Sequence, residues 1–451
     1  MEINTLMSIS PIDGRYRKTV EKISEYFSEF AYIKYRVIVE IKWLERILNN
    51  SQIVDFKGNI KVLENIISNF NLKECQRVKE FEQTTNHDVK AIEYYIREKI
   101  KGTEVEPYSH FVHFACTSED INNIAHSLML KDALNSIVIP QMDEIIKAVE
   151  SKAQKLKNLS MLAHTHGQPA TPTTVGKELA VFVYRWNYIK NKIMSIKLKS
   201  KFNGATGNFA AHSVCIDIDW IEFAKEFVES FKLEYNPLVT QIESHDTICE
   251  VMSYIKLFNN ITMDFNQDMW TYISMKYFKQ KTVATETGSS VMPHKVNPIN
   301  HENSMANIRM ANSIIDNFTN NLQVSRMQRD LSDSSNLRNI GVVLAHTIIS
   351  ITQTIKGFAK MEPNEDVLRE DLENNPEVLA EAIQTMLRKN GYNNAYEMLK
   401  DLTRGKEVTL NSMREFVNSL NIPNVDKEKL LKLTPSNYIG LSSKLVDYAK
   451  L

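Results

Sequence analysis

Residues 288–298, which read GSSVMPHKVNP, concentrate much of the reactive chemistry that this sequence offers. The chain has only 13 glycines in 451 residues, yet this stretch holds a glycine, two serines, two prolines, a histidine, a lysine and an asparagine. Gly288 would let the backbone approach a ligand closely. A serine here could be a nucleophile, although the G-x-S-x-G pattern is absent. It could also act as a base if Lys295 and backbone N–H groups stabilised its alkoxide.

The residues that follow the serines suit an anionic substrate. Lys295 and Asn297 could neutralise a substrate carboxylate as negative charge builds on it. Glu302 follows on the next predicted helix and could orient a histidine. Residue types alone leave two interpretations of this loop open, a catalytic segment and a plain connection between helices.

A second reactive segment is THGQPATPTT (165–174). His166 precedes Gly167 and Pro169, so we expect it just before the start of a helix, where loop residues often carry chemistry. Lone histidines more often have structural roles, and His164 lies two residues away. The residue type therefore does not decide which histidine reacts.

The segment CTSEDINN (116–123) has the pattern of a helix start. Thr117 or Ser118 can cap the helix, and Glu119 and Asp120 fall in its first turn. The segment could be a plain cap. Alternatively, its hydroxyls and free N–H groups could hold a carboxylate or a phosphate.

Two further segments offer charged groups. In NHDVKAIEYY (86–95), Asp88 could orient His87, or Asn86 or Asp88 could simply cap a helix. In RDLSDSSNLR (329–338), two arginines flank a cluster of serines and could clamp a phosphate, or the segment could be a solvated turn. The residues of this second segment that could bind are Arg329, Ser332, Ser334, Ser335 and Arg338.

Long helices must position these segments. Residues 177–203, 238–287 and 299–340 contain neither glycine nor proline, and a helix of about 40 residues would be roughly 60 Å long. Apolar residues in 251–273 recur mostly at three- and four-residue steps, which is helical periodicity. Strand-like alternation is scarce. The sequence therefore predicts an all-α fold built around a bundle of long helices.

We expect three domains, which are an N-terminal helical domain (1–112), a central long-helix bundle (113–363) and a C-terminal helical domain (364–451). Residues 361–377 are acidic and rich in turn formers, which indicates a boundary. Beyond them, the pattern predicts a helix, a stop at Gly391 and a second helix.

Composition excludes several classes of protein. The net charge of −1 and the pI near 6.8 argue against a nucleic-acid partner bound by a broad basic face. The uncharged run 339–355 is short and polar for a membrane span and fits a buried helix better. The N-terminus lacks the pattern of a signal peptide. Four dispersed cysteines, without zinc-ligand spacing or a disulfide framework, favour a cytoplasmic protein; they are Cys75, Cys116, Cys215 and Cys249.

Taken together, the motifs resemble a known family. GSSVMPHKVNP resembles the signature loop of the fumarase/aspartase superfamily, whose members eliminate across a succinyl unit and release fumarate. Other motifs look like those of the adenylosuccinate lyase family, of the longer bacterial type, over residues 10–345 or so. These motifs are SPIDGRY, NHDVKA, TSEDINN, THGQPATPTT and QRDLSDSSNLRN.

The resemblance implies an all-helical chain in three domains, with a central bundle that joins four copies into a twenty-helix core. It implies cleavage of adenylosuccinate to AMP and fumarate, and of the succinylated carboxamide ribotide SAICAR to AICAR and fumarate, in purine biosynthesis. In the family, one active site is shared between subunits of the homotetramer. No metal and no organic cofactor are implied, and neither nucleic acid nor membrane is an expected partner.

The resemblance also implies roles for individual residues. Ser289, six residues before Lys295, is the expected base that removes the proton from the succinyl β-carbon, and His166 is the expected acid that protonates the departing nitrogen. His87 should bind or orient the substrate, and Glu302 should support His166. The remaining residues are expected to bind the substrate: Arg15, Tyr16, Asn86, Asp88, Thr117, Ser118, Gln241, Lys295, Val296, Asn297, Asn303, Arg329, Ser334, Ser335, Asn336, Leu337 and Arg338.

Three residues depart from the family pattern, and two kinds of rival interpretation are open: a sister enzyme and an inactive scaffold. Thr206, Ala211 and His164 stand where close relatives usually carry Val, Asn and Arg. Argininosuccinate lyase, aspartase and fumarase share the signature loop, but SPIDGRY and the SDSSNLR clamp favour a phosphorylated nucleotide. The other rival is an inactive helical scaffold. The joint presence of the proposed acid, base and their supporting residues argues against it.

Overall fold

A computed structural model of the chain describes residues 5–281, 292, 295–404 and 408–450. Helices make up most of the described residues, and the few strands form three two-stranded sheets, so the predicted all-α class is confirmed. The chain divides into two compact units, each built from three separate segments. Unit 1 comprises Met1–Met142, Ile189–Asn260 and Ala306–Thr352, and unit 2 comprises Asp143–Tyr188, Ile261–Met305 and Gln353–Leu451.

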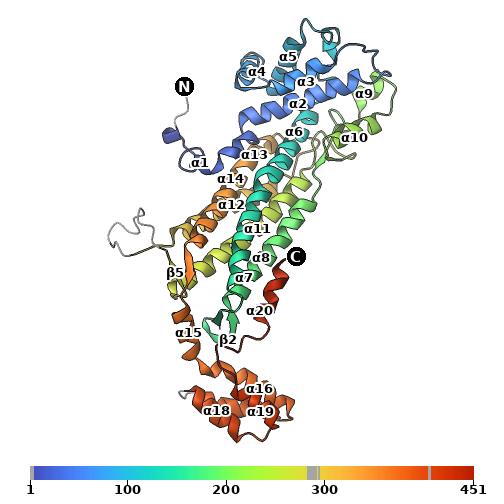
Figure 1. The fold of residues 1–451 in the computed structure, drawn as a ribbon. Helices are drawn as coiled ribbons and strands as arrows, with labels where there is room; N and C mark the ends of the chain where they lie inside the picture. The colour runs from blue at the N-terminus through green and yellow to red at the C-terminus, as the bar shows by residue number, and fades with distance from the viewer. Residues whose placement is uncertain (1–4, 282–291, 293–294, 405–407, 451) are drawn as a thin grey trace. The chain divides into compact units, whose positions relative to one another are not determined.

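The N-terminal part of unit 1 is a cluster of helices around its own apolar core (Figure 1). Its central helix α2 begins after Ser28, whose hydroxyl accepts a hydrogen bond from the Ala31 N–H at 3.1 Å. Seventeen buried residues between Ile33 and Val112 form the core. The helices are α1 (Arg17–Val20), α2 (Glu29–Leu48), α3 (Lys61–Ser68), α4 (Leu72–Thr85) and α5 (Asp88–Ile100).

Long helices follow, as the sequence predicts, although they are shorter than the stretches free of glycine and proline. The longest, α11, has 29 residues and ends just before Lys276, which has a left-handed φ of 64°. A π-helical turn, Leu134–Val138, links α6 to α7. The long helices are α6 (Ser118–Ala133), α7 (Ile139–Lys155), α8 (Val175–Ser195), α11 (Asp246–Ser274), α12 (Ile299–Asn321) and α14 (Ile340–Ala359).

The C-terminal part of unit 2 has a separate apolar core between Leu379 and Leu430. The predicted helix stop is confirmed, because α16 ends before Gly391, which has a φ of +84°. The helices are α15 (Glu365–Glu373), α16 (Ala380–Lys389), α17 (Ala395–Thr403), α18 (Leu410–Ser419), α19 (Asn424–Leu431) and α20 (Ser442–Leu445). The separate apolar cores in the N-terminal and C-terminal parts of the sequence fit the predicted division into three domains. The division itself stays a prediction.

The remaining elements are short. Strands β1 (Ser160–Thr165) and β2 (Gln168–Thr174) form an antiparallel hairpin in unit 2. The other two pairs are β3 (Lys199–Ser200) with β4 (Glu234–Tyr235), which is parallel, and β5 (Phe278–Gln280) with β6 (Met361–Pro363), which is antiparallel. The short helices α9 (Ala210–Cys215), α10 (Trp220–Ser230) and α13 (Ser332–Leu337) belong to unit 1.

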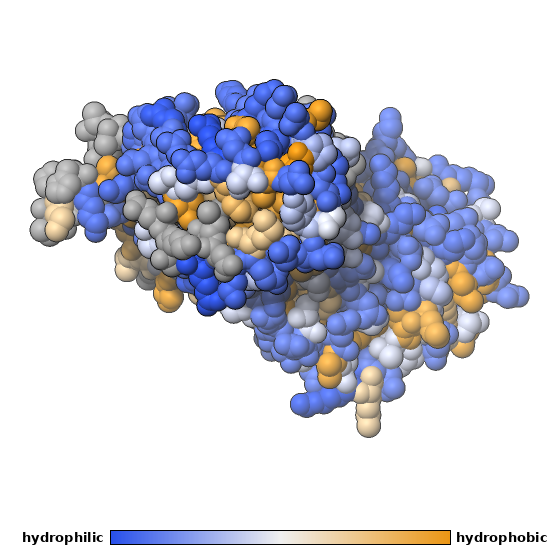
Figure 2. Space-filling view, turned by 90° about the horizontal axis from the view of Figure 1, so that it is seen from below, coloured by the Kyte–Doolittle hydropathy of each residue, from blue (hydrophilic) through white to orange (hydrophobic). Residues whose placement is uncertain are grey.

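One stretch, Ser332–Ala359, is long and apolar enough to cross a membrane by length and composition alone. However, 67% of its most apolar window is buried inside the structure, as expected for a helix packed in a core. On the face drawn in Figure 2, hydrophilic residues predominate and apolar residues form small separate groups.

Candidate active site

The start of α6 is built as a capped helix in unit 1. Thr117 is its N-cap residue, and the Asp120 carboxylate accepts a hydrogen bond from the Thr117 N–H at 2.8 Å. The other Asp120 oxygen pairs with the ammonium group of Lys201 at 2.7 Å, and both side chains are fully buried. The predicted helix start is therefore confirmed. Asp120 is committed to structure, which leaves Thr117 and Ser118, both half-buried, as the residues that could meet a ligand.

Two predicted binding residues from distant parts of the sequence meet in unit 1. The Arg329 guanidinium donates to the amide oxygen of Gln241 at 3.2 Å and forms an ion pair with the buried Glu119 carboxylate at 3.1 Å. The Gln241 amide group in turn donates to the carbonyl oxygen of Ala205 at 3.0 Å. Sequence reasoning placed Glu119 only in the first turn of a helix. Its pairing with Arg329 had no local signal.

The NHD segment, residues 86–88, connects α4 to α5. Asn86 ends α4 in the left-handed region, with a φ of 51°, and His87 is the N-cap of α5. His87 Nδ1 accepts a hydrogen bond from the Lys90 N–H at 3.1 Å, so the neutral ring carries its proton on Nε2. The sequence suggested Asn86 or Asp88 as the cap. That interpretation is wrong, because the His87 ring itself supplies the acceptor.

Asp88 and the predicted clamp residue Arg338 also meet in unit 1. Their closest side-chain atoms are 3.7 Å apart, and Arg338 forms a second ion pair with Glu29 at 2.8 Å. Burial opposes ionisation of Asp88, but the Arg36 guanidinium at 2.8 Å, the Val89 N–H and the neighbouring His87 together outweigh burial and lower the pKa of this carboxyl below its ordinary value. Asp88 is therefore an anion that binds arginines.

The serines of the predicted clamp lie on a short helix, α13, rather than in an open turn. The Ser334 N–H donates to the Asp333 carboxylate at 2.6 Å, and Asp333 pairs with the buried His245 ring at 3.2 Å. Ser335 is exposed, Leu337 is buried, and the Asn336 side chain accepts a hydrogen bond from Asn317 at 2.9 Å.

Arg15 is exposed and Tyr16 half-buried just before α1, and their roles stay predictions.

His166, the proposed acid, lies in unit 2 at the tip of the β1–β2 hairpin. His166 and Gly167 form a two-residue turn with φ values of 55° and 73°, and residues 164–169 are exposed. Positive φ at both turn positions is the geometry that tight hairpins favour. The expectation that His166 immediately precedes a helix is wrong, because α8 begins only at Val175. Gly167 was a turn signal that could have indicated the hairpin.

The other proposed catalytic residues also belong to unit 2. Ser289 and Ser290 lie outside the described residues. Of the signature loop, 288–298, the structure describes residues 292 and 295–298. Lys295 is exposed, and the Val296 carbonyl oxygen accepts a hydrogen bond from the Gln280 side chain at 2.9 Å. Asn297 and Asn303 are half-buried. Glu302 accepts a hydrogen bond from the Trp270 indole at 3.2 Å. In the described part of the chain, it is not paired with His166.

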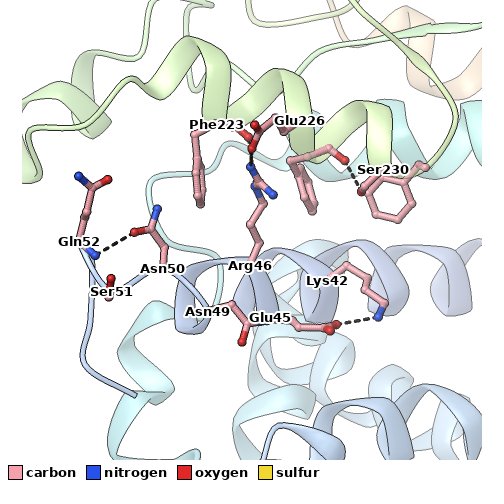
Figure 3. Close-up of a pocket in the computed structure, with 12 residues that line it drawn as sticks. Lys42, Glu45, Arg46, Asn49, Asn50, Ser51, Gln52, Phe223, Glu226 and Ser230 are labelled. Carbon is pink, nitrogen blue, oxygen red and sulfur yellow. Dashed lines mark hydrogen bonds and ion pairs between the residues drawn. The ribbon is translucent and has the colours of Figure 1, made fainter. Parts of the chain in front are cut away.

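A separate cavity of about 750 Å³ opens between α2 and α10 in unit 1 (Figure 3). Arg46 forms an ion pair with Glu226 in this cavity, and Lys42 pairs with Glu45 at 2.7 Å. None of the predicted site residues lines it, and its charged side chains balance, so this cavity is not the candidate active site. Among the described residues, no group of three or more His, Cys, Asp or Glu side chains could hold a metal ion.

Solved structures with a similar fold include a fumarate lyase and a cycloisomerase. A fumarate lyase from Mesorhizobium sp. BNC1 aligns with a TM-score of 0.76 at 16% identity, over 95% of this chain and 97% of that one. A β-carboxy-cis,cis-muconate cycloisomerase from Acinetobacter calcoaceticus sp. ADP1 aligns with a TM-score of 0.74 at 17% identity, over 96% and 99% of the two chains. At such low identity, these likenesses establish the fold alone.

Sequence comparison is more specific. Residues 14–315 match a family model described as Lyase, and residues 325–439 match one described as Adenylosuccinate lyase C-terminal. The chain is 47% identical over 456 residues to the adenylosuccinate lyase of Buchnera aphidicola subsp. Schizaphis graminum, covering 100% of both chains. It is 43% identical over 456 residues to the adenylosuccinate lyase of Escherichia coli strain K12, again covering 100% of both. The chain therefore belongs to the adenylosuccinate lyase family.

Proposed function

We propose that this enzyme cleaves adenylosuccinate to AMP and fumarate in purine biosynthesis, and SAICAR to AICAR and fumarate by the same chemistry. The observation that carries the proposal is the full-length identity of 43–47% to adenylosuccinate lyases. The signature loop, residues 288–298, and the proposed acid, His166, accompany it in the sequence. The four cysteines are free, which supports a cytoplasmic location.

The reaction is a β-elimination. The Ser289 hydroxyl, as its alkoxide, removes a proton from the succinyl β-carbon, and the electron pair left on that carbon delocalises into the neighbouring carboxylate. The electron pair then forms the carbon–carbon double bond of fumarate as the carbon–nitrogen bond breaks. His166 donates a proton to the departing nitrogen. Lys295 and Asn297 stabilise the doubly charged carboxylate while it carries the extra negative charge.

The nucleotide phosphate binds the arginines of unit 1. Arg329 and Arg338 are now paired with the carboxylates of Glu119, Glu29 and Asp88. A phosphate dianion offers more acceptor oxygens and more charge than a single carboxylate, so it can recruit guanidinium N–H groups that these pairs leave open. Residues that hold a phosphate in this way distinguish a nucleotide from argininosuccinate, aspartate or malate.

The proposed assembly is a homotetramer with shared sites. Helix α8 exposes Val181, Tyr184 and Tyr188, with exposed fractions of 39%, 46% and 56%. These residues follow one another at steps of three and four, so they form one apolar stripe along the helix. Such a stripe on a central helix favours packing against other copies, as in a twenty-helix core. A histidine and a glutamate that do not pair within one chain, His166 and Glu302, fit a site completed by another subunit.

The test is to incubate the purified protein separately with adenylosuccinate, SAICAR, argininosuccinate, aspartate and malate, and to follow fumarate and the second product of each substrate. We expect turnover of the two succinylated nucleotides and none of the others. Turnover of argininosuccinate without adenylosuccinate would assign the chain to a sister enzyme. Absence of turnover with all five substrates would favour the inactive scaffold.

A further inference from the structure

We propose that Arg36, which belongs to none of the predicted site motifs, is a positioning residue that joins the NHD segment to the nucleotide clamp. Here the nucleotide clamp means Arg329 and Arg338, and Gln241 is a neighbouring residue that is expected to bind the succinyl part of the substrate. The inference rests on the proposed function, because it treats Asp88 and the clamp as binding groups for the nucleotide. Every contact that carries it lies within unit 1.

Arg36 bridges two of the motif segments from the middle of α2. Its side chain is only 1% exposed. One terminal nitrogen of the guanidinium forms an ion pair with the Asp88 carboxylate at 2.8 Å, and Nε donates to the side-chain oxygen of Asn122 at 2.8 Å. Asp88 belongs to the NHD segment and Asn122 to the TSEDINN segment, so a single side chain fixes the two segments relative to each other.

The contacts continue from Asn122 to the clamp. The Asn122 amide donates to Glu119 Oε1 at 2.8 Å, and the same carboxylate oxygen pairs with Arg329 at 3.1 Å. Arg329 reaches Gln241 at 3.2 Å. An unbroken series of side chains therefore leads from Asp88 through Arg36 to Gln241, and a shift at Arg36 is passed to both ends.

A tyrosine ring ties Arg36 to the second clamp arginine. The Arg36 guanidinium carbon lies 3.6 Å from the centre of the Tyr32 ring, and that of Arg338 lies 5.1 Å from the same centre. Both arginines also contact the same oxygen of Asp88. Cation–π attraction and the shared carboxylate therefore hold Arg338 at a position that Arg36 and Tyr32 define.

The cluster is not optimised for stability alone. Tyr32 Oη and Arg36 Nη1 are buried without a hydrogen-bond partner in the described part of the chain. Unpaired buried polar atoms are costly, and native proteins keep few of them, often where function requires it. Tyr32 and Arg338 also line a cavity of about 110 Å³, together with His126.

Lysine cannot replace this arginine. The guanidinium is a planar fork that meets Asp88 and Asn122 at once, whereas an ammonium is a point charge at the end of a flexible chain. Arg36→Lys keeps the positive charge beside Asp88 but should lose the bridge to Asn122. The clamp should then sample more positions, and nucleotide binding should weaken while the acid and base remain intact.

The test compares Arg36→Lys with a matched control on the same helix, Arg46→Lys. Arg46 also pairs with a carboxylate, Glu226, and also lies over an aromatic ring, with its guanidinium carbon 4.2 Å from the centre of the Phe223 ring, but its surroundings contain no predicted site residue (Figure 3). For both variants and the wild type, we would measure kcat, the KM for adenylosuccinate, the Kd for AMP and the melting temperature.

For Arg36→Lys we expect KM and the AMP Kd to rise together by about tenfold, the usual consequence of losing a hydrogen bond to a charged group. We expect kcat to stay within about threefold of wild type, because a positioning residue for binding does not act in the chemical step. Arg46→Lys should leave KM and the AMP Kd unchanged. A purely structural role would instead lower the active fraction, so kcat would fall with KM and the AMP Kd unchanged, and that result would overturn the proposal.

A second variant keeps the proposal testable if Arg36→Lys does not fold. Asn122→Ala breaks the same bridge and leaves Arg36 paired with Asp88, so it should raise KM and the AMP Kd in the same direction. Where all variants fold, the double variant should add little to either single one. Unchanged AMP affinity in Asn122→Ala would contradict the inference. A wild-type protein that does not cleave adenylosuccinate would instead contradict the proposed function.

Discussion

The two compact units differ in how several of their proposed functional residues are held. In unit 1, Asp88, Gln241 and Arg329 are fixed by other side chains of the same unit at 2.8–3.2 Å. In unit 2, His166 is exposed at a hairpin tip and Lys295 is exposed within the signature loop. The difference fits the proposed shared site, in which the binding groups are positioned in advance within one chain and the chemical groups meet those of another chain.

The proposed roles of the residues explain part of this difference. A side chain that must hold a phosphate in one place benefits from fixed partners, because less entropy is lost when the ligand binds. A side chain that completes a site on a neighbouring subunit must instead reach outward from a rigid support. The two-residue turn at His166 and Gly167 provides such a support, since both φ values are held in the left-handed region by the β1–β2 pairing.

The largest expected effect is on kcat, from replacing the proposed base of unit 2. Ser289→Ala should lower kcat by roughly a hundred- to ten-thousand-fold, because it removes the proposed base, while adenylosuccinate still binds. Ser290→Ala should be milder. Single-turnover assays and calorimetric titration of both variants would measure the two effects. The reverse order of severity would show that the base is assigned to the wrong serine.

A smaller effect is expected on nucleotide affinity, from replacing the clamp arginines of unit 1. Arg329→Ala and Arg338→Ala should each weaken the binding of adenylosuccinate and AMP alike, by about 1.5–3 kcal/mol, because both ligands carry the phosphate. Fumarate has no phosphate, so its inhibition constant serves as the control and should change little. If both variants bound AMP as tightly as the wild type, Arg329 and Arg338 would have no role in holding the phosphate.

A third expected effect, on stability and not on activity, concerns the pH dependence of folding in unit 1. Burial lowers the pKa of His126 to about 3, and Arg36 adds to the effect. Above pH 7 the ring is neutral in both the folded and the unfolded chain, so it has no influence. As the pH falls below about 6.5, the unfolded chain takes up a proton that the folded chain refuses, and folding is destabilised by about 2 kcal/mol at pH 5.

Replacing His126 with a side chain that does not titrate, as in His126→Gln, should remove this acid sensitivity. Denaturant unfolding at pH 7 and pH 5 would measure it, and the loss of stability between the two values should be about 2 kcal/mol smaller in the variant than in the wild type. An equal loss in both proteins would show that His126 is readily protonated in the folded chain.

Features set by neighbouring residues could be predicted from the sequence. The cap at Thr117, the stop at Gly391 and the all-α class depend on local hydrogen bonding and on helical periodicity, and all three are confirmed. The family assignment was predictable for a related reason. The signature loop is long and its residue types are specific, so few unrelated chains would contain it.

Features set by distant residues could not be predicted in this way. Arg36 and Asn122 are 86 residues apart, and neither carries a local signal of their contact. The hairpin at His166 was missed for a different reason, because its prolines and threonines resemble the start of a helix more than a strand. The β1–β2 pairing and the turn at Gly167 decide that local structure.

The proposal that one active site takes residues from different subunits is tested most directly by combining two inactive chains. His166→Ala and Ser289→Ala chains, carrying different affinity tags, would be co-expressed and the mixed oligomers purified through both tags. If His166 and Ser289 of one site come from different subunits, about a quarter of the sites in randomly mixed tetramers should have both residues intact. Activity should then return to a sizeable fraction of wild type. If both residues came from the same chain, every site would lack one of them, and the mixed oligomers would stay as inactive as either variant alone.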